Sequence, residues 1–242
     1  MNINKIAKKI IVALDAVDVT DAVEIINELK GFIDIFKIGQ GFINRYGAEE
    51  SIKFIHNLDK EVFFDQKIGD IPMQVGEAVN AVSWLSPYII SVQALSGKNA
   101  MKSAVKNKHK SKIFAVTLLT SFSENDCVRI FNRSRIEQVK ILIEEAKKAN
   151  VDGIICSGRD LEILNEQCPE CLGNLLKIIP GIRPTWFPHK DQKMTITPKK
   201  AFELGADYIV IGRPITDCLI NEDYLERLMK ILKEISDLEV KD

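Results

Sequence analysis

The chain has 242 residues, 46% of them hydrophobic and 28% charged, and 33 Lys and Arg against 34 Asp and Glu leave a formal net charge of -1. This composition supports a sizeable core and excludes a mainly disordered chain. The charge balance disfavours a nucleic-acid binder with a basic surface, and no stretch approaches the roughly 20 apolar residues of a membrane span. We therefore expect a soluble, cytoplasmic protein with no nucleic-acid or membrane partner.

Eight short runs rich in β-branched or aromatic residues are predicted to be strands. They cover residues 10–15, 33–39, 62–67, 89–94, 113–119, 152–156, 177–182 and 208–213. Between them, apolar residues return every three or four positions, as in helices that face a core. Examples are residues 20–30, 73–85, 135–149 and 197–205, and a last helix is expected near 216–238.

The ends of successive predicted strands lie roughly 22 to 37 residues apart, which is room for one strand and one helix. Eight such units predict an α/β fold, a (β/α)8 TIM barrel, as one domain over residues 1–242. The alternative is an open doubly wound sheet, which would carry a glycine-rich dinucleotide turn. The nearest candidate turn, Gly39-Gln40-Gly41, has Asn44 where the third glycine belongs.

Charged residues mark the ends of the first three predicted strands: Asp15, then Lys37, then Asp65 and Lys67. Asp65 and Lys67 are two apart, so a regular strand places both on one face. An isolated inward-facing charge costs several kcal/mol, so we expect these groups to form one network at the barrel mouth. We favour a functional network over a purely structural one. Asp70, just past the third strand, is either part of it or the N-cap of the following helix.

The last two predicted strands end in an anion-binding pattern. Arg183 follows the seventh strand, and Gly212 and Arg213 follow the eighth, where barrels often bind phosphate. A glycine lets backbone N–H groups approach phosphate oxygens, and an arginine offers a bidentate fork. Gln192 in the seventh loop is expected to donate its amide to the same group.

The five cysteines are odd in number and scattered, and the start of the chain has no secretory pattern, so we expect them to be reduced. Cys168 and Cys171 form the one close pair. It supplies at most half of a zinc site, and incidental surface cysteines are the favoured interpretation.

These residues together resemble the orotidine 5'-phosphate decarboxylase family over nearly the whole chain. The resemblance rests on Asp15 in VALD, Lys37 in FKIG, the run DQKIGDIP from Asp65, Thr120 in TLLTS, PGIR ending at Arg183, DQ ending at Gln192, and GRPI from Gly212. Related sugar-phosphate barrels share Asp-x-Lys-x-x-Asp. The Ile-Pro that follows it, together with PGIR, DQ and GRPI, narrows the match.

The resemblance implies decarboxylation of orotidine 5'-monophosphate to uridine 5'-monophosphate and CO2, the last step of de novo pyrimidine synthesis, without metal or cofactor. It implies that Lys67 protonates C6 and that Asp65 lies near the departing carboxylate. Lys37 would hold Asp65 and a ribose hydroxyl, and Asp15 would contact the ribose.

The same resemblance assigns the phosphate to Arg213, Gly212, Gln192 and Arg183. It places Asp70 in the neighbouring subunit's site, which implies a homodimer. The pyrimidine contact in TLLTSFS stays open among Thr120, Ser121 and Ser123.

Several positions depart from the pattern of many relatives. Gln66 replaces a leucine, Gly69 and Gln93 each replace a histidine, and Met73-Gln74 replaces Asn-Thr. In relatives that Thr contacts ribose across the dimer, so its replacement by Gln74 leaves the contact unassigned. All the charged residues are present.

Two other functions remain open on the residues alone. A magnesium-dependent sugar-phosphate decarboxylase or aldolase would keep Asp65, Lys67 and Asp70, but would add an acidic metal ligand near the second strand and lack Asp191-Gln192. A non-catalytic phosphate-binding regulator would tolerate the loss of Lys67.

Overall fold

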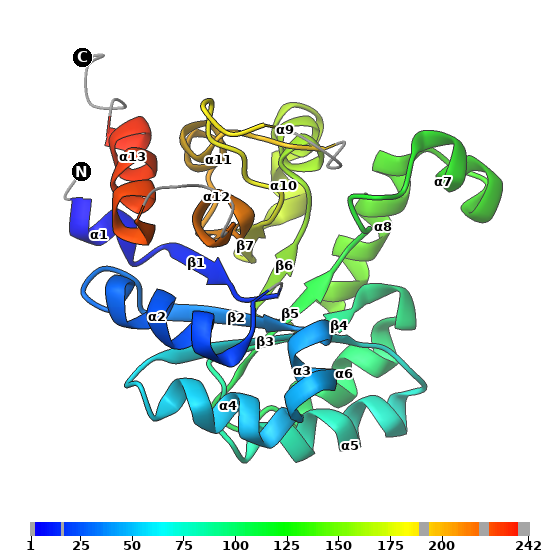
Figure 1. The fold of residues 1–242 in the computed structure, drawn as a ribbon. Coiled ribbons are helices and arrows are strands. Elements are labelled where there is room, and N and C mark those ends of the chain that lie inside the picture. The colour runs from blue at the N-terminus through cyan, green and yellow to red at the C-terminus, as the bar shows by residue number, and fades with distance from the viewer. Residues whose placement is uncertain (1–2, 16, 189–193, 218–222, 237–242) are drawn as a thin grey trace.

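Eight parallel strands close into a barrel in the computed structural model, which describes residues 3–15, 17–188, 194–217 and 223–236 (Figure 1). The strands are β1 (Ile10–Ala13), β2 (Ile35–Gly39), β3 (Glu61–Ile68), β4 (Ile89–Gln93), β5 (Lys112–Val116), β6 (Gly153–Ile155), β7 (Leu176–Ile179) and β8 (Tyr208–Ile211). Each pairs with the next, and β8 pairs with β1. The predicted (β/α)8 barrel is confirmed. Strands β1, β5, β7 and β8 stop two or three residues short of their predicted ends, and β4 and β6 stop one residue short, where the chain turns into the loops of the barrel mouth.

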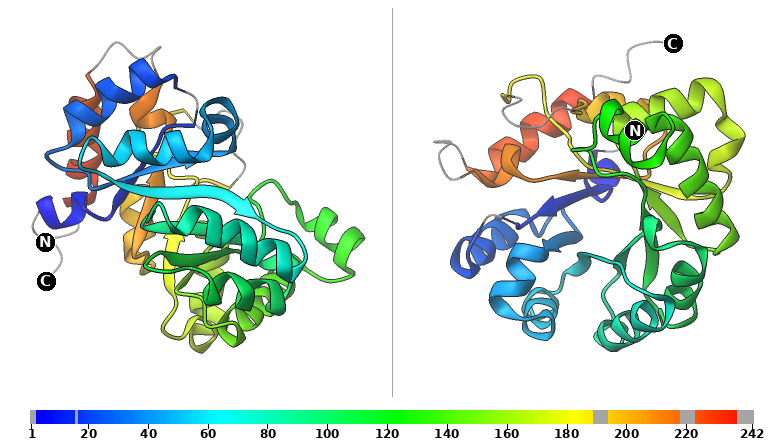
Figure 2. Two further views of the ribbon diagram at one scale, coloured as in Figure 1. Left: turned by 90° about the horizontal axis from the view of Figure 1, so that it is seen from below. Right: turned by 90° about the vertical axis from the view of Figure 1, so that its right-hand side faces the viewer.

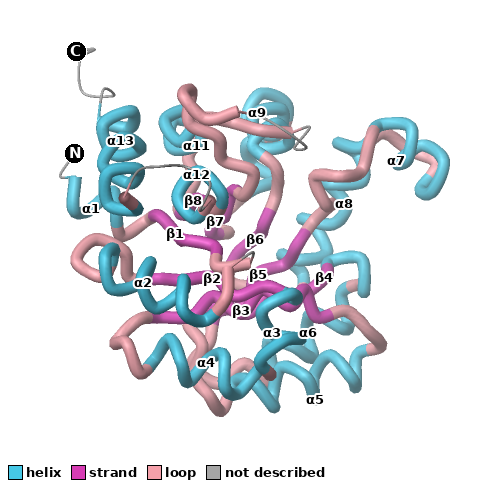
Figure 3. The backbone as a smooth tube through the Cα atoms, in the orientation of Figure 1, coloured by secondary structure: helices cyan, strands magenta, loops and turns pink. Residues whose placement is uncertain are grey.

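Helices surround the strands on the outside of the ring (Figure 3). They are α1 (Ile3–Ala7), α2 (Val19–Leu29), α3 (Gln40–Tyr46), α4 (Ala48–His56), α5 (Pro72–Ser83), η1 (Ala94–Ser96), α6 (Lys98–Lys106), α7 (Glu124–Phe131), α8 (Arg135–Lys148), α9 (Gly158–Gln167), α10 (Pro169–Leu172), α11 (Pro198–Glu203), α12 (Arg213–Thr216) and α13 (Tyr224–Ser236). Within the described ranges, none of these helices has the length and apolar character needed to cross a membrane.

The end of the chain differs from the single helix predicted near 216–238. Helix α12 ends at Thr216, and the next residue, Asp217, is extended with φ -74° and ψ 109°. That backbone conformation cannot continue a helix. The long helix α13 begins only at Tyr224 and packs beside α2 and α1.

Two apolar cores lie on opposite sides of the barrel wall, because side chains alternate along each strand. The larger core joins the outward faces of the strands to the helices, with Ile10 and Val12 of β1 among its members. The smaller core fills the barrel interior and takes residues from every strand: Ile11, Ala13, Ile35, Phe63, Ile89, Phe114, Val116, Ile155, Ile178 and Val210. Inward-facing groups above this filling therefore lie at the carboxyl ends of the strands, where barrels place their sites.

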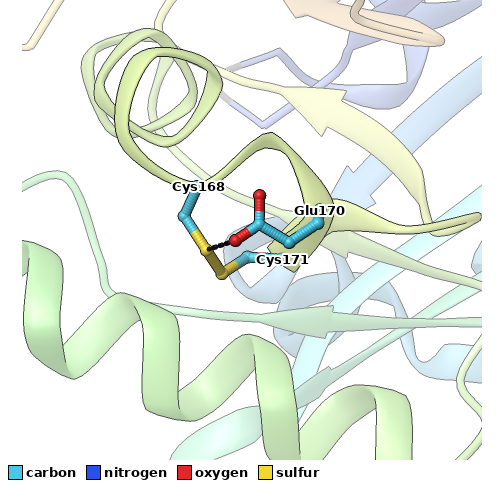
Figure 4. Close-up of side chains that lie close together, drawn as sticks. All are labelled: Cys168, Glu170 and Cys171. Carbon is cyan, nitrogen blue, oxygen red and sulfur yellow. Dashed lines mark hydrogen bonds between the residues drawn. A yellow bond between two sulfur atoms is a disulfide. The ribbon is translucent and has the colours of Figure 1, made fainter.

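The cysteines differ from expectation. Cys168 and Cys171 form a disulfide between α9 and β7, with Cα atoms 5.4 Å apart (Figure 4), so the prediction that all cysteines are reduced is wrong here. The three-residue spacing and the turn into α10 bring both Cβ atoms within bridging range. Cys127 and Cys156 are free but buried rather than on the surface, because they pack into the outer core. Cys218 lies outside the described residues.

A buried ion pair fixes the loop after β5. Arg135 at the start of α8 is 5% exposed and Asp160 in α9 is 1% exposed. The Arg135 Nε and Nη2 donate to the two Asp160 oxygens at 2.8 and 2.7 Å, and Nη1 donates to the carbonyls of Leu119 and Phe122 at 3.2 and 3.0 Å. Burial acts to lower the pKa of Arg135, but the hydrogen bond and the charge of Asp160 raise it overall. The pair thus ties two helices to this loop, beyond which α7 projects from the ring (Figure 2).

We expect Asp160→Ala to destabilise the fold by about 3–5 kcal/mol, because it leaves the Arg135 guanidinium buried without its carboxylate. Urea unfolding measures the change. Lys148→Ala is the control, since it removes only surface ion pairs, with Glu144 (2.7 Å) and Glu145 (3.2 Å), and should not shift the unfolding midpoint. Equal midpoints for the two variants would show that the Arg135 pair does not hold the fold.

Candidate active site

Four charged side chains of alternating sign form a chain across the barrel mouth. Lys37 Nζ of β2 lies 2.6 and 2.5 Å from the two oxygens of Asp15, which follows β1. It also lies 3.4 Å from Oδ2 of Asp65, and that oxygen lies 2.8 Å from Nζ of Lys67. The structure therefore brings together the four residues for which the sequence predicts a network.

The middle of this chain is buried and its ends are open. Lys37 and Asp65 are each 6% exposed, whereas the side chains of Lys67 and Asp15 are 30% and 48% exposed. A buried charge without a partner would be costly, and here each buried group has charged partners on both sides. The two exposed ends leave an ammonium and a carboxylate accessible to a ligand.

Strand β3 is irregular where it carries Asp65 and Lys67. Phe64 pairs with Ile90, but Ile68 pairs with Val92. The register shifts between these pairs, because β3 advances four residues while β4 advances two. Lys67 takes up the excess with a left-handed φ of 54°, which is uncommon for a residue other than glycine. The two side chains meet across this bulge, and the prediction that a regular strand face brings them together is wrong in its geometry.

Gly39 makes room for the ion pair next to it. A Cβ at this position would lie 2.4 Å from Asp15 Oδ1 and 3.3 Å from Lys37 Nζ. Any side chain here would displace the Asp15 carboxylate, so the glycine is needed for this close approach.

Two cavities open over the charged chain and share Lys37, Asp65, Lys67, Pro180 and Val210 in their walls. The first, of about 150 Å³, is mostly apolar and is completed by Phe63, Val116, Leu118, Leu119, Thr120, Ile155, Cys156 and Ser157. The second, of about 350 Å³, has both polar and apolar walls and is completed by Ala13, Asp15, Gly181, Arg183, Gly212, Arg213 and Thr216. A ligand that fills both has a mainly apolar, compact end and an anionic end.

The lining of the first cavity distinguishes among the three hydroxyl residues after β5 that are candidates for the pyrimidine contact. Thr120 lines the cavity, whereas the Ser123 hydroxyl caps α7 by accepting from the Asp126 N–H at 3.1 Å. Ser121 is not among the lining residues. Ser157 is a lining residue that the sequence reasoning missed, although a serine directly after the sixth predicted strand was a signal for it. Cys156 is also a lining residue, but its thiol packs into the outer core, where burial raises its pKa.

The second cavity gathers the predicted phosphate-binding residues that the structure describes. Arg183 is 4% exposed, and its guanidinium lies over the Phe187 ring at 5.5 Å from the centroid. Gly212 precedes α12, which begins at Arg213. Gln192, like Asp191, lies outside the described residues.

Asp70 lies apart from the four-residue chain. It is exposed, and its Oδ1 accepts the N–H of the next residue, Ile71, at 2.6 Å. Helix α5 begins at Pro72 with Ile71 as its N-cap, so the helix-cap interpretation of Asp70 is wrong. Ile71 and Met73 beside it are 60% and 65% exposed.

Two of the departures from the family pattern touch each other. A Cβ at Gly69 would lie 3.0 Å from the Gln93 Cγ and 3.1 Å from its Cβ. The side chain of Gln93 therefore occupies the space beside Gly69. Gln66 offers its carbonyl to Gln40 Nε2 at 3.0 Å, and Met73 and Gln74 are exposed.

One group of side chains in the described part of the chain has metal-ligand spacing. Cys168, Glu170 and Cys171 offer ligand atoms within 4.8 Å of one another (Figure 4). They lie between α9 and β7, which is the end of the barrel opposite the charged chain. The two sulfurs bond each other here, whereas a metal ion would require thiolates.

Comparison with known proteins assigns the chain to a family. The model of the orotidine 5'-phosphate decarboxylase / HUMPS family matches residues 8–218. The orotidine 5'-phosphate decarboxylase of Carboxydothermus hydrogenoformans is 34% identical over 93% of this chain and 98% of its own length. That of Aquifex aeolicus is 36% identical over 94% and 99%.

A solved structure agrees with these relatives. The crystal structure of orotidine 5'-phosphate decarboxylase from Lactobacillus acidophilus has a TM-score of 0.73 and 30% identity, and the match covers 94% of this chain and 99% of that one. The barrel, the charged chain at its mouth and these similarities agree, and the chain belongs to the orotidine 5'-phosphate decarboxylase / HUMPS family.

Proposed function

We propose that the protein converts orotidine 5'-monophosphate to uridine 5'-monophosphate and CO2 in pyrimidine synthesis, with Lys67 as the proton donor to C6. The observation that carries the proposal is the pair of cavities joined over Asp65 and Lys67. The pyrimidine base fits the apolar cavity, and the phosphate fits the cavity that contains Arg183 and Arg213. The bond between C6 and the carboxylate then lies over the shared wall.

The reaction needs one proton and no redox partner. The C6–carboxylate bond breaks, CO2 leaves, and the electron pair left on C6 takes a proton from Lys67 Nζ. Asp65 Oδ2 lies 2.8 Å from Lys67 Nζ and holds the proton donor where negative charge develops. Lys37 holds Asp65 and contacts a ribose hydroxyl, and Asp15 contacts the ribose.

The remaining groups hold the ends of the substrate. Thr120 contacts the pyrimidine, and Arg213, Arg183, Gly212 and Gln192 bind the phosphate. Binding energy from the phosphate, remote from C6, helps to close the site. We also propose that the chain acts as one domain over residues 1–242 in the cytoplasm.

Decarboxylation without a metal ion distinguishes this function from magnesium-dependent sugar-phosphate chemistry. Lys37 Nζ already lies within 3.4 Å of both Asp15 and Asp65, so an ammonium neutralises these two carboxylates. The test follows the loss of orotidylate absorbance with EDTA-treated protein. Activity that requires added Mg²⁺ favours the sugar-phosphate alternative, and nucleotide binding without CO2 release favours a non-catalytic regulator.

We expect Lys67→Ala to abolish turnover while uridine 5'-monophosphate still binds, because the proton is needed only in the transition state. Steady-state kinetics and product titration measure the two effects. Lys53→Ala, which removes a side chain 52% exposed on α4, is the control and should keep the parental rate. A parental kcat in Lys67→Ala would remove the proton-donor role.

Arg213→Ala should raise KM about 10- to 100-fold, because a charge-assisted hydrogen bond contributes about 1.5–3 kcal/mol. Arg129→Ala, at a side chain 78% exposed on α7, is the matched arginine control. Orotidine without its phosphate should be a poor substrate for the parent enzyme. If it is turned over as well as the nucleotide, the second cavity does not bind phosphate.

We propose a homodimer in which Asp70 enters the partner's site, supported by its exposure and by the exposed Ile71 and Met73 beside it. Homodimers of Lys67→Ala and of Asp70→Ala should both be nearly inactive. Mixed dimers should contain one complete site, made of Lys67 from one chain and Asp70 from the other. Random exchange gives about half mixed dimers, so activity should recover to about a quarter of the parental value.

Exchange through mild denaturant, followed by a decarboxylation assay, measures the recovery. Mass-tagged chains verify that mixed dimers have formed. No recovery after verified exchange would return Asp70 to its own subunit.

A further inference from the structure

Ser91, in the middle of β4, links that strand to both reactive groups of β3. It is fully buried, with 0% of its surface exposed, and lies two residues beyond Ile89, which belongs to the barrel interior. Its hydroxyl donates to Asp65 Oδ1 at 2.8 Å and accepts the backbone N–H of Lys67 at 2.9 Å. One oxygen atom thus contacts both residues.

The direction of these two hydrogen bonds follows from chemistry. A backbone N–H can only donate, so Ser91 Oγ must accept from Lys67. Its single proton is then free to go to Asp65, which accepts as a carboxylate. Asp65 Oδ1 is occupied by this bond, and Oδ2 is left to face the ammonium groups of Lys67 and Lys37 at 2.8 and 3.4 Å. The hydroxyl therefore sets which oxygen meets the proton donor.

The same hydroxyl supports the unusual backbone of Lys67. The residue lies where β3 and β4 are out of register and has φ 54°. Such a conformation persists only where its surroundings enforce it, and a buried N–H needs a partner. Ser91 supplies that partner from the neighbouring strand.

We propose that Ser91 is a positioning residue for the decarboxylation, acting through the Asp65 carboxylate and the Lys67 backbone. The inference rests on the proposed function of those two residues. Removing the hydroxyl frees the carboxylate to rotate and releases the Lys67 backbone, which moves Nζ relative to the substrate. The groups proposed to bind phosphate keep their places.

The test compares Ser91→Ala and Ser91→Thr in steady-state decarboxylation and thermal unfolding. We expect Ser91→Ala to lower kcat about 10- to 100-fold, since small misplacements of reacting groups have effects of this size, with KM changed less than about threefold. Ser91→Thr keeps the hydroxyl and suits a strand, so it should restore most of the rate.

Ser111→Ala is the matched control. Ser111 is 2% exposed and precedes β5 at the opposite end of the barrel, and its hydroxyl has no hydrogen-bond partner among the described residues. Its replacement should leave kcat and KM at parental values. If Ser91→Ala does not fold, Ser91→Cys takes its place with the same expectation, because a thiol of similar size is only a weak donor.

The outcomes separate this inference from the proposed function. A parental protein that releases no CO2 from orotidine 5'-monophosphate overturns the function itself. If the parent is active, the inference fails when Ser91→Ala keeps kcat within about twofold, or when a folded Ser91→Thr loses as much as Ser91→Ala. Equal losses in kcat and kcat/KM with restored activity in Ser91→Thr support it.

Discussion

The buried contact between Lys37 and Asp65 is the constraint on which the barrel mouth depends. These residues come from adjacent strands. The β2–β3 register sets Gly39 opposite Asp65, and Lys37 lies two residues before Gly39 in β2. Neither charge can be buried alone without a large desolvation cost, so each requires the other and a further partner. Asp15 supplies that partner on one side and Lys67 on the other. The closed barrel, by holding β1, β2 and β3 side by side, makes this order of charges available.

The loop after β5 at the barrel mouth is held by contacts outside the charged chain. The loop after β5 is held from outside the barrel, because Arg135 binds the carbonyls of Leu119 and Phe122 while its charge is met by Asp160. That arrangement places Thr120 in the apolar cavity without requiring it to contact the charged chain. In such barrels the strands and helices form a rigid scaffold, and the loops at the mouth carry the ligand-binding residues.

The sequence predicted the barrel well because spacing and alternation depend on local pattern. It also predicted which charges meet, since lone inward charges are excluded by their cost. It missed the bulge in β3, where Lys67 is left-handed and its N–H donates to a hydroxyl from another strand, because such contacts have no local pattern. Ser91 gave no signal of its own, as a serine in a strand is ordinary. The Arg135–Asp160 pair was missed because its two residues are far apart in the sequence.

The two cavities meet at the charged residues of the barrel mouth. Lys37, Asp65 and Lys67 line both cavities, so a ligand that extends from Arg183, Gly212 and Arg213 into the apolar cavity lies beside these charges. A ligand whose anionic end is held in the second cavity has fewer positions open to its other end. Binding therefore orients that end in the apolar cavity. The bulge in β3 holds the Lys67 ammonium in the wall that the two cavities share.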